Sequence, residues 1–409
     1  MIMRFGQRRS HSLQSGAIAS GLCLSEAQRH EREASDEDGR TSRSYTNKSG
    51  ETVLREVQDD GGWLATYYVY DDYGNLRYVL PPQATKQIGS TFSGAAYQNA
   101  LEQLAFQYVY DKRQRMVFRR TPGTDAGTEM VYDERDRLVL SQNARQAELN
   151  QWSFIKYDAL NRPVMTGVYS DARSRSDLEA AVATQGFAES RTGGPVGYSL
   201  TNSFPSVSEA DVRTVTYYDD YGFSSYTYGG DKIAQPIGQT TGSRTRVIGS
   251  DTWLTTVVWY DHRHRVVHTI SENHRGGADK VTHTYDFVGN LLTRTHQHSS
   301  SLTLRETYRY DHADRLLEVK HQTNNEGAVV VAEYQYNELG EVIEKNLHRR
   351  GSDAFAQSAD YRYNIRGWLQ HINGSTLQPN DTVNPDTGQP ADLFGLDLMY
   401  HQNPLGLDE

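Results

Sequence analysis

Histidine is the first residue type in this chain whose spacing could support chemistry. His262, His264 and His268 fall in one short stretch, and His296 and His298 fall in a later one. Residues two apart on a strand share a face, so such pairs could offer two imidazoles to one metal ion. The chain has no His-Glu-x-x-His motif, no Cys pair and no identifiable carboxylate partner for these residues. We therefore expect solvated histidines on strands and no metal site.

The aspartates are the second such set, because two carboxylates flanking a sugar could hydrolyse a glycoside. Eight of them, however, occupy one repeated place directly after a tyrosine. Catalysis needs two carboxylates, not one in every repeat. The chain also lacks a Gly-x-Ser-x-Gly elbow, a P-loop and a dinucleotide fingerprint. The sequence thus predicts no enzyme, no catalytic residue and no cofactor.

The repeated place of aspartate defines the organisation of the chain, since self-similarity at a steady spacing indicates a repeat architecture. Neighbouring units mostly lie 22 to 27 residues apart. In the last two units Asn replaces Asp after the tyrosine. The residues that define the repeats are Tyr70-Asp71, Tyr110-Asp111, Tyr132-Asp133, Tyr157-Asp158, Tyr218-Asp219, Tyr260-Asp261, Tyr285-Asp286, Tyr310-Asp311, Tyr336 and Tyr363.

Each unit is predicted to be a β-hairpin. Tyr308 and Tyr310 alternate with a polar residue, which places both rings on one face of a strand. Asp is a favoured first residue of a β-turn, and three positions later comes a residue that tolerates positive φ. That position holds Gly289, Gly340 or Gly367, or Asn161 or Asp314. A lone hairpin is marginal in water, but stacked hairpins align their tyrosines into ladders and bury their faces.

The composition agrees with an array of this kind. The 409 residues include 27 Tyr but only 36% hydrophobic residues, so tyrosine must supply much of the packing. A net charge of −10 argues against nucleic acid as a partner. No apolar run is long enough for a membrane span, and the N-terminus has no clean signal peptide.

Three segments follow from this pattern. Residues 1–41 are expected to be disordered or irregular, residues 42–372 to form the YD-repeat region, and residues 373–409 to form a C-terminal segment. Within the repeats, short helices are predicted over residues 95–105, after the stop at Pro81-Pro82, and over residues 176–185. A degenerate hairpin is expected between Tyr218 and Tyr260. The fold class is therefore all-β: an antiparallel hairpin array forming a curved or spiralling sheet, with short helical insertions.

These units resemble the YD repeats of the Rhs family, which includes the shells of bacterial polymorphic toxins and of insecticidal toxin complexes. Residues 70–82, 156–164 and 363–369 carry the resemblance most clearly and are similar to Bacteroidetes-type members. The resemblance covers roughly residues 42 to 409. It implies that the sheet spirals into a hollow cocoon, of which this chain would form part, around a toxin polypeptide. Family shells are longer and end in an Asp-Pro-x-Gly-Leu cleavage motif. The closest match here, residues 403–407, has Asn in place of Asp, so we expect no self-cleavage and no toxin domain.

Two functions remain open at this point. The resemblance implies a structural shell segment that encapsulates and delivers a C-terminal toxin, with its own or a neighbouring toxin polypeptide and further YD repeats as partners. The alternative is a secreted or cell-surface adhesin that binds glycans through Trp63, Trp152, Trp253, Trp259 and Trp368. Either would place the protein outside a bacterium or at its surface.

Overall fold

A computed structural model describes residues 4–5, 30–35, 40–59, 61–88, 94–124, 126–298, 301–351, 354–374 and 392–400. The chain divides into two compact units, Met1–Val215 and Thr216–Glu409. Each unit is built from antiparallel strands that pair with their neighbours in chain order.

The first unit contains thirteen strands among its described residues. They are β1 (Arg4–Phe5), β2 (His30–Ser35), β3 (Thr41–Thr46), β4 (Thr52–Asp59), β5 (Gly62–Asp71), β6 (Leu76–Leu80), β7 (Phe106–Tyr110), β8 (Met116–Arg120), β9 (Thr128–Tyr132), β10 (Leu138–Gln142), β11 (Gln151–Tyr157), β12 (Pro163–Ser170) and β13 (Val212–Tyr218), whose last residues enter the second unit. From β2 onward each strand is antiparallel to the next, whereas the two-residue β1 runs parallel to the end of β5.

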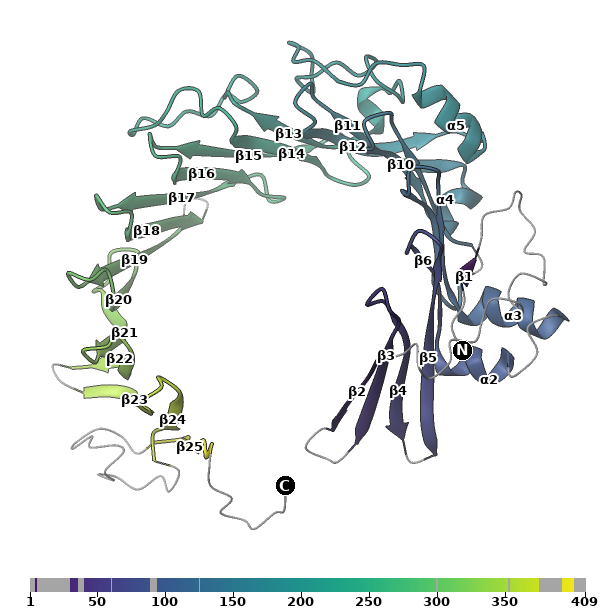
Figure 1. The fold of residues 1–409 in the computed structure, drawn as a ribbon. Coiled ribbons are helices and arrows are strands. Elements are labelled where there is room, and N and C mark those ends of the chain that lie inside the picture. Colours follow the sequence, from purple (N-terminus) through teal and green to yellow (C-terminus); the bar gives the residue numbers. More distant parts are fainter. Residues whose placement is uncertain are drawn as a thin grey trace. The chain divides into compact units, whose positions relative to one another are not determined.

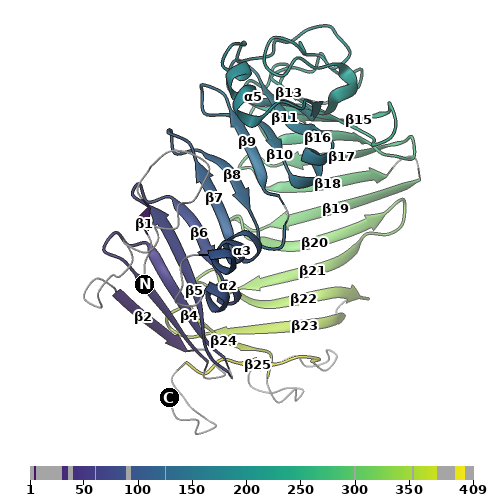
Figure 2. The ribbon, with the colours of Figure 1, turned by 90° about the vertical axis from the view of Figure 1, so that its right-hand side faces the viewer.

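The second unit continues the same pattern. Its strands are β14 (Thr240–Arg246), β15 (Trp253–Tyr260), β16 (Val266–Glu272), β17 (Ala278–Tyr285), β18 (Leu291–His298), β19 (Leu302–Tyr310), β20 (Leu316–Thr323), β21 (Val329–Tyr336), β22 (Val342–Arg350), β23 (Ala354–Tyr363), β24 (Leu369–Ile372) and β25 (Leu396–Asp397). All are paired antiparallel in chain order, and Figure 2 shows β15 to β23 side by side. Within this unit the strands follow a curved sheet (Figure 1). The predicted fold class, an all-β YD-hairpin array with few helices, is confirmed.

Short helices interrupt the first unit (Figure 1). They are α2 (Pro82–Ile88), α3 (Gly94–Leu104), α4 (Ala144–Glu148), α5 (Arg175–Val182) and the 3-10 turn η2 (Glu209–Asp211). The helix predicted over residues 95–105 corresponds to α3. The stop predicted at Pro81-Pro82 is where β6 ends, at Leu80. The helix α2, which was not predicted, begins at Pro82, where the locked φ and missing N–H of proline are tolerated. In α5 the N-cap is Ser174, and the helix ends three residues before the predicted Gln185.

A strand also occurs where the sequence indicated irregular structure. β2 lies within residues 1–41 and pairs along its whole length with β3. Its sequence has no apolar alternation, and charge complementarity supports the pairing instead. The Arg43 guanidinium of β3 lies 2.9 Å from Glu33 and 3.6 Å from Glu31. Residues 1–3, 6–29 and 403–407, which include the N-terminal region and the predicted cleavage-motif match, lie outside the described residues.

Two insertions in the first unit cover the sheet face opposite the repeat tyrosines. The α2 and α3 helices pack on Val69, Tyr78 and Leu80, and Val69 lies on the other face from its neighbour Tyr70. Further along, Trp152, Phe154 and Lys156 alternate as buried residues on β11, again opposite Tyr157. The segment between β12 and β13 covers them.

One insertion in the second unit does the same. The segment between Tyr218 and β14 places the ring of Tyr221 5.8 Å from Trp259, and Tyr228 stacks 4.5 Å from His268. Trp259 is buried, and on β15 it lies on the face opposite its neighbour Tyr260. The hairpin predicted between Tyr218 and Tyr260 is present as the β14–β15 hairpin, whereas the loop before it, which packs on the sheet, was not predicted. We call the opposite side, which carries the repeat tyrosines, the tyrosine face.

Candidate functional site

The repeated Tyr-Asp turn is the arrangement that the sequence singled out, and its geometry is clearest at Asp261. The backbone N–H of Asp261 donates to the Arg265 carbonyl oxygen at 2.9 Å, and the His264 N–H donates back to the Asp261 carbonyl oxygen at 3.0 Å. The Asp261 carboxylate accepts from the N–H groups of Arg263 (2.8 Å) and Arg265 (2.9 Å) through Oδ1. Its Oδ2 accepts from Arg265 Nε at 2.7 Å. One side chain thus satisfies three donors of a five-residue turn.

The fourth position of the repeat turns has the positive φ that the sequence predicted, except at Asp219. Gly289, Gly340 and Gly367 have φ of 124°, 86° and 75°, and Asn161 and Asp314 have φ of 64° and 61°. The next strand then resumes with a one-residue register shift against the tyrosine. This is the geometry of a type I turn followed by a bulge, which preserves the twist of the hairpin.

The first and fifth residues of the turn are chemically matched, a signal that the sequence reasoning missed. In seven turns the first residue is Asp and the fifth is a donor, Arg or Asn. At Asn47 and Asn337 a Glu at the fifth position accepts from the Asn amide. The turns at Asp219 and Asn364, with Phe223 and Trp368 at the fifth position, lack this match. The carboxylate-to-donor pairs are Asp71–Asn75, Asp111–Arg115, Asp133–Arg137, Asp158–Arg162, Asp261–Arg265, Asp286–Asn290 and Asp311–Arg315. The two Asn–Glu pairs reverse donor and acceptor while retaining the bond.

The repeat tyrosines stand at the end of the strand before each turn. Tyr110, Tyr132, Tyr157, Tyr218, Tyr260, Tyr285, Tyr310, Tyr336 and Tyr363 are each the last residue of their strand, and Tyr70 is the residue before the last. In six of them the phenol donates to a backbone carbonyl oxygen at the start of a strand in the preceding hairpin, at 2.8–3.0 Å. These bonds are Tyr70 to Thr52, Tyr132 to Met116, Tyr157 to Leu138, Tyr260 to Thr240, Tyr285 to Val266, and Tyr336 to Leu316.

The turn arginines make the reverse connection, from one hairpin to the next. The guanidinium of Arg265, already bonded to Asp261, lies 4.5 Å from the ring of Tyr285 and donates to the Asp286 carbonyl oxygen at 3.2 Å. The same ring contact joins Arg115 to Tyr132, Arg137 to Tyr157, and Arg315 to Tyr336. The predicted tyrosine ladder is therefore connected by Asp, Arg and Tyr in alternation, through hydrogen bonds and cation–π contacts.

The ionisation of these groups follows from the same contacts. Burial alone would raise the pKa of the Asp261 carboxyl, but the hydrogen bonds from Arg265 and Arg263 outweigh it and hold the pKa below its usual value. At Asp311 the Arg315 N–H, followed by its guanidinium, lowers the pKa to about 2. Burial raises the pKa of the Tyr285 phenol, against the opposing charge of Arg265. The turns therefore hold ionised aspartates beside neutral tyrosines.

Asp219 departs from this pattern. Its N–H donates to the Gln239 carbonyl oxygen at 3.1 Å, and its Oδ1 accepts from the Gly238 N–H at 2.7 Å. The covering loop of the second unit is thus inserted directly after Asp219. The end of this loop, at Gly238 and Gln239, is hydrogen-bonded to Asp219.

A buried ion pair anchors the insertion between β12 and β13. Lys156 Nζ lies 2.5 Å from Glu189 Oε1 and donates to the Ser203 carbonyl oxygen at 2.8 Å, and both ionic side chains are fully buried. Glu189 also accepts from the hydroxyls of Ser199 and Ser203. Burial tends to raise the pKa of the Glu189 carboxyl, but Lys156 and the two hydroxyls lower it overall. The donors to Glu189 come from β11 and from the insertion itself, so these bonds fix the insertion to the sheet.

The structure separates the histidines of the earlier stretch. His262 Nε2 lies 3.5 Å from Asp231 Oδ1 on exposed loops, and His264 occupies the positive-φ position of its turn. His268 is buried, stacks on Tyr228, and its Nδ1 lies 2.8 Å from the hydroxyl of Thr282. Burial lowers the pKa of its imidazole. These three histidines do not converge on one point, whereas His296 and His298 do meet a third polar side chain.

The tryptophans do not form one exposed platform. Trp152 and Trp259 are each only 1% exposed, so their rings cannot stack on a sugar in this structure. The ring of Trp63 lies 4.3 Å from the Arg43 guanidinium, and that of Trp253 lies 5.5 Å from Arg246. Trp368 packs against Arg366 and Tyr400.

The turns and strands together define the class of this protein: a YD-repeat β-hairpin array in which each hairpin is bonded to the next. Comparison with known proteins adds distant likenesses. No family model matches the chain, and no curated protein does. Among solved structures, the crystal structure of TcdB2-TccC3-Cdc42 is similar to it, at 13% identity and a TM-score of 0.32 over 82% of this chain and 17% of that one. TcdB2-TccC3 without its hypervariable C-terminal region is similar at 12% identity and a TM-score of 0.31, over 85% of this chain and 18% of that one.

A third similar structure is a porin-like protein from Bacteroides uniformis, with 9% identity, a TM-score of 0.22, and coverage of 65% of this chain and 86% of that one. The chain spans less than a fifth of the two TcdB2-TccC3 chains. We assign neither family nor function from likenesses at this level. Over the described residues, the structure contains no helix long and apolar enough to cross a membrane.

Proposed function

We propose that this chain is a wall segment of an Rhs-type toxin shell, and that its function is to enclose a toxin polypeptide until delivery. The observation that carries the proposal is the one-sided covering of the sheet. In both units, insertions pack on the face opposite the repeat tyrosines. A wall that must admit an unfolded or folding chain needs one face that its long insertions leave uncovered. Among the described residues, α2, α3 and the two long loops leave the tyrosine face uncovered.

The chemistry of the tyrosine face suits containment. On β19 it carries half-buried Leu304, Glu306, Tyr308 and Tyr310, while the intervening residues are exposed on the other face. Such a mixed surface offers a cargo polypeptide weak, dispersed contacts and no deep specific pocket. The repeated Asp–Arg–Tyr connections supply the rigidity that a wall requires. We accordingly propose that the protein is not an enzyme and acts outside the bacterial cell or at its surface.

The alternative function, glycan binding by an adhesin, rests on the three tryptophans that retain exposure or lie near the surface. Trp63 and Trp368 are 38% and 42% exposed, but each has an arginine over its ring. We place this function second, because two of the five proposed rings are buried.

Electron microscopy of the protein purified from its natural producer, with whatever chain adjoins it, tests the proposal. A closed particle with internal density that disappears when the adjoining toxin-encoding sequence is deleted would support containment. An open sheet without internal density, together with saturable binding on a glycan array that is lost in Trp63→Ala or Trp368→Ala, would contradict containment and favour the adhesin.

A further inference from the structure

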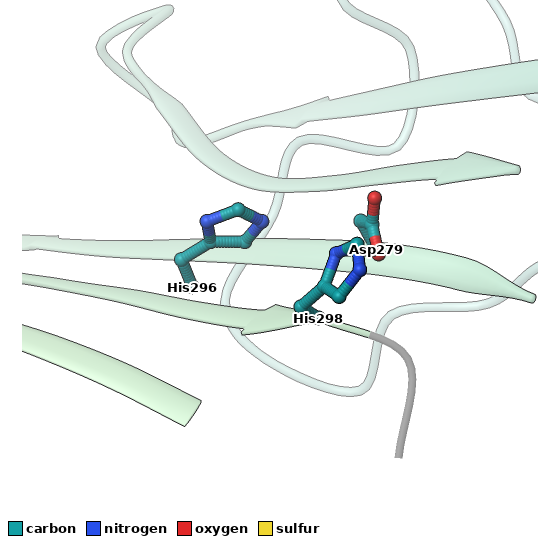
Figure 3. A group of neighbouring side chains, drawn as sticks. All are labelled: Asp279, His296 and His298. Carbon is teal, nitrogen blue, oxygen red and sulfur yellow. Dashed lines mark ion pairs between the residues drawn. The ribbon is translucent and has the colours of Figure 1, made fainter. Parts of the chain in front are cut away.

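A group of three polar side chains lies at the ends of β17 and β18, away from the Asp286 turn. Asp279 comes from β17, and His296 and His298 come from β18 (Figure 3). One ligand atom from each side chain can be chosen so that all three lie within 4.8 Å of one another. Among the described residues, no other three His, Cys, Asp or Glu side chains form such a group.

Strand register explains why these residues meet. Lys280 pairs with Gln297 and Val281 with His296, so Asp279 stands opposite His298. Because side chains alternate along a strand, His296 and His298 share the face that also carries Asp279. It is the tyrosine face, since Tyr285 lies six positions after Asp279 on β17 and even offsets on a strand share a face. The arrangement therefore depends on backbone pairing and not on a mobile loop.

The spacing suits a divalent transition-metal ion. His298 Nδ1 lies 2.8 Å from Asp279 Oδ1. Two ligands bound to one zinc ion at about 2.0–2.2 Å are separated by about 3.3–3.6 Å in tetrahedral geometry, so this pair would open slightly to share an ion. The ligand atom of His296 lies within 4.8 Å of the other two and would have to move closer. The ring planes of the two histidines are nearly perpendicular, at 83°, so they are not packed face to face.

The exposure of the three side chains and a neighbouring amide also suit metal binding. His298 is exposed, whereas Asp279 and His296 are half-buried. This leaves the remaining coordination positions open to water. The Asn273 amide lies 3.5 Å from Asp279 Oδ1, on the side of the carboxylate that faces the β16–β17 turn. Such a neighbour can orient a ligating carboxylate.

The geometry points to a metal site in which Asp279, His296 and His298 bind one divalent transition-metal ion, best represented by Zn²⁺, with water completing the coordination. Two imidazoles and one carboxylate are ligands that zinc prefers. The ion would link the ends of β17 and β18 that lie farthest from their own turn. It would thus fasten both ends of this hairpin, one through Asp286 and the other through the metal. This inference concerns the hairpin alone and does not depend on the proposed shell function.

Zinc binding by the full-length chain tests the site. Isothermal titration with Zn²⁺ should give one site that is weakened at least tenfold in His298→Ala and again in Asp279→Asn, with His312→Ala as the matched control. His312 is an exposed histidine in the turn between β19 and β20, outside the proposed site. Because His298 is exposed, its substitution should leave the fold intact, which the circular dichroism spectrum would verify.

Co²⁺ substitution gives an independent reading. We expect visible absorption bands of a low-symmetry nitrogen- and oxygen-ligated ion in the wild type and in His312→Ala, and their loss in His298→Ala and in His296→Ala. Equal Zn²⁺ affinity in wild type, His298→Ala and Asp279→Asn would overturn the proposal. Co²⁺ bands that persist in both histidine variants would overturn it as well, because the ion would then be bound elsewhere.

Discussion

Replacing Asp261 provides the most direct probe of how a Tyr-Asp turn is stabilised. Asp261→Ala removes the acceptor for two backbone N–H groups and for the Arg265 side chain. We assign about 1 kcal/mol to each backbone bond and up to about 1 kcal/mol to the partly exposed ion pair, a total of about 2–3 kcal/mol. Asp261→Asn retains an oxygen for the backbone groups but replaces Oδ2 with an amide NH2 that cannot accept from Arg265, so we expect a loss of stability of about 1 kcal/mol.

The chain suggests a reciprocal change that restores the lost bond. Asn337 and Glu341 hold the same turn positions with donor and acceptor reversed. Asp261→Asn combined with Arg265→Glu should therefore be more stable than Arg265→Glu alone by about 1 kcal/mol, which a double-mutant cycle measures. The free energy of unfolding of the double variant will remain about 0.5–1 kcal/mol below that of the wild type, because Glu cannot replace the Arg265 contact with the Tyr285 ring.

Hydrogen exchange followed by mass spectrometry is the suitable assay, since a repeat array can open locally without unfolding as a whole. A loss of about 2–3 kcal/mol corresponds to exchange about 30- to 150-fold faster in the peptide that contains residues 261–265. Asp72→Ala, at an exposed second turn position, is the matched control and should leave exchange unchanged. Equal exchange in wild type and Asp261→Ala, or additive effects in the double-mutant cycle, would refute the reasoning.

Three other contacts lead to predictions of their own. Tyr285→Phe keeps the ring but removes the bond to the Val266 carbonyl oxygen, and should lower the free energy of unfolding in urea by about 0.5–1.5 kcal/mol. Lys156→Met leaves the Glu189 carboxylate buried without its cation and should cost about 3–5 kcal/mol, seen as a lower thermal midpoint. The pKa of Asp311 is about 2 in the folded chain against about 3.9 unfolded, so its stabilisation is present above pH 4 and is lost as the pH falls from about 4 to about 2. The protection factor of amides in its turn, corrected for intrinsic exchange at each pH, should fall across that range.

Each of these predictions has a control within the chain. Tyr73→Phe alters an exposed tyrosine in a turn and should be silent, as should Lys112→Met at an exposed lysine. The turn at residues 364–368 contains no carboxylate among its five residues, so its protection factor should not fall between pH 4 and pH 2. Losses of stability as large in the control variants as in the test variants would contradict the assigned roles. A protection factor at the Asp311 turn that does not change between pH 4 and pH 2 would contradict them as well.

The repeat itself could be predicted from the sequence because its signals are local. Alternation placed Tyr308 and Tyr310 on one face, and the positive-φ positions were marked by residues that tolerate them. The matched residues at the first and fifth turn positions were also legible, since Asn337 with Glu341 mirrors Asp311 with Arg315. That pattern required comparing units side by side instead of examining each alone.

What covers each face could not be predicted in the same way. Lys156 lies on a strand whose other residues gave no sign of a buried cation, and its partner Glu189 is 33 residues away. The burial of Trp259 likewise depends on Tyr221 and Tyr228, which belong to an irregular loop without periodicity. The group formed by Asp279 and His298 required the register of two strands, which only backbone pairing settles. Contacts between distant segments set these outcomes.

The central claim, that the tyrosine face encloses a polypeptide, is tested most directly by photo-cross-linking from the two faces of one strand. Leu302 and Thr307 are both exposed on β19 but lie on opposite faces, Leu302 on the tyrosine face. A photoreactive phenylalanine at each position, in the natural gene product with its adjoining chain, should label toxin sequence from position 302 and not from position 307. Labelling of that sequence from position 307 alone, or equally from both, would contradict the claim.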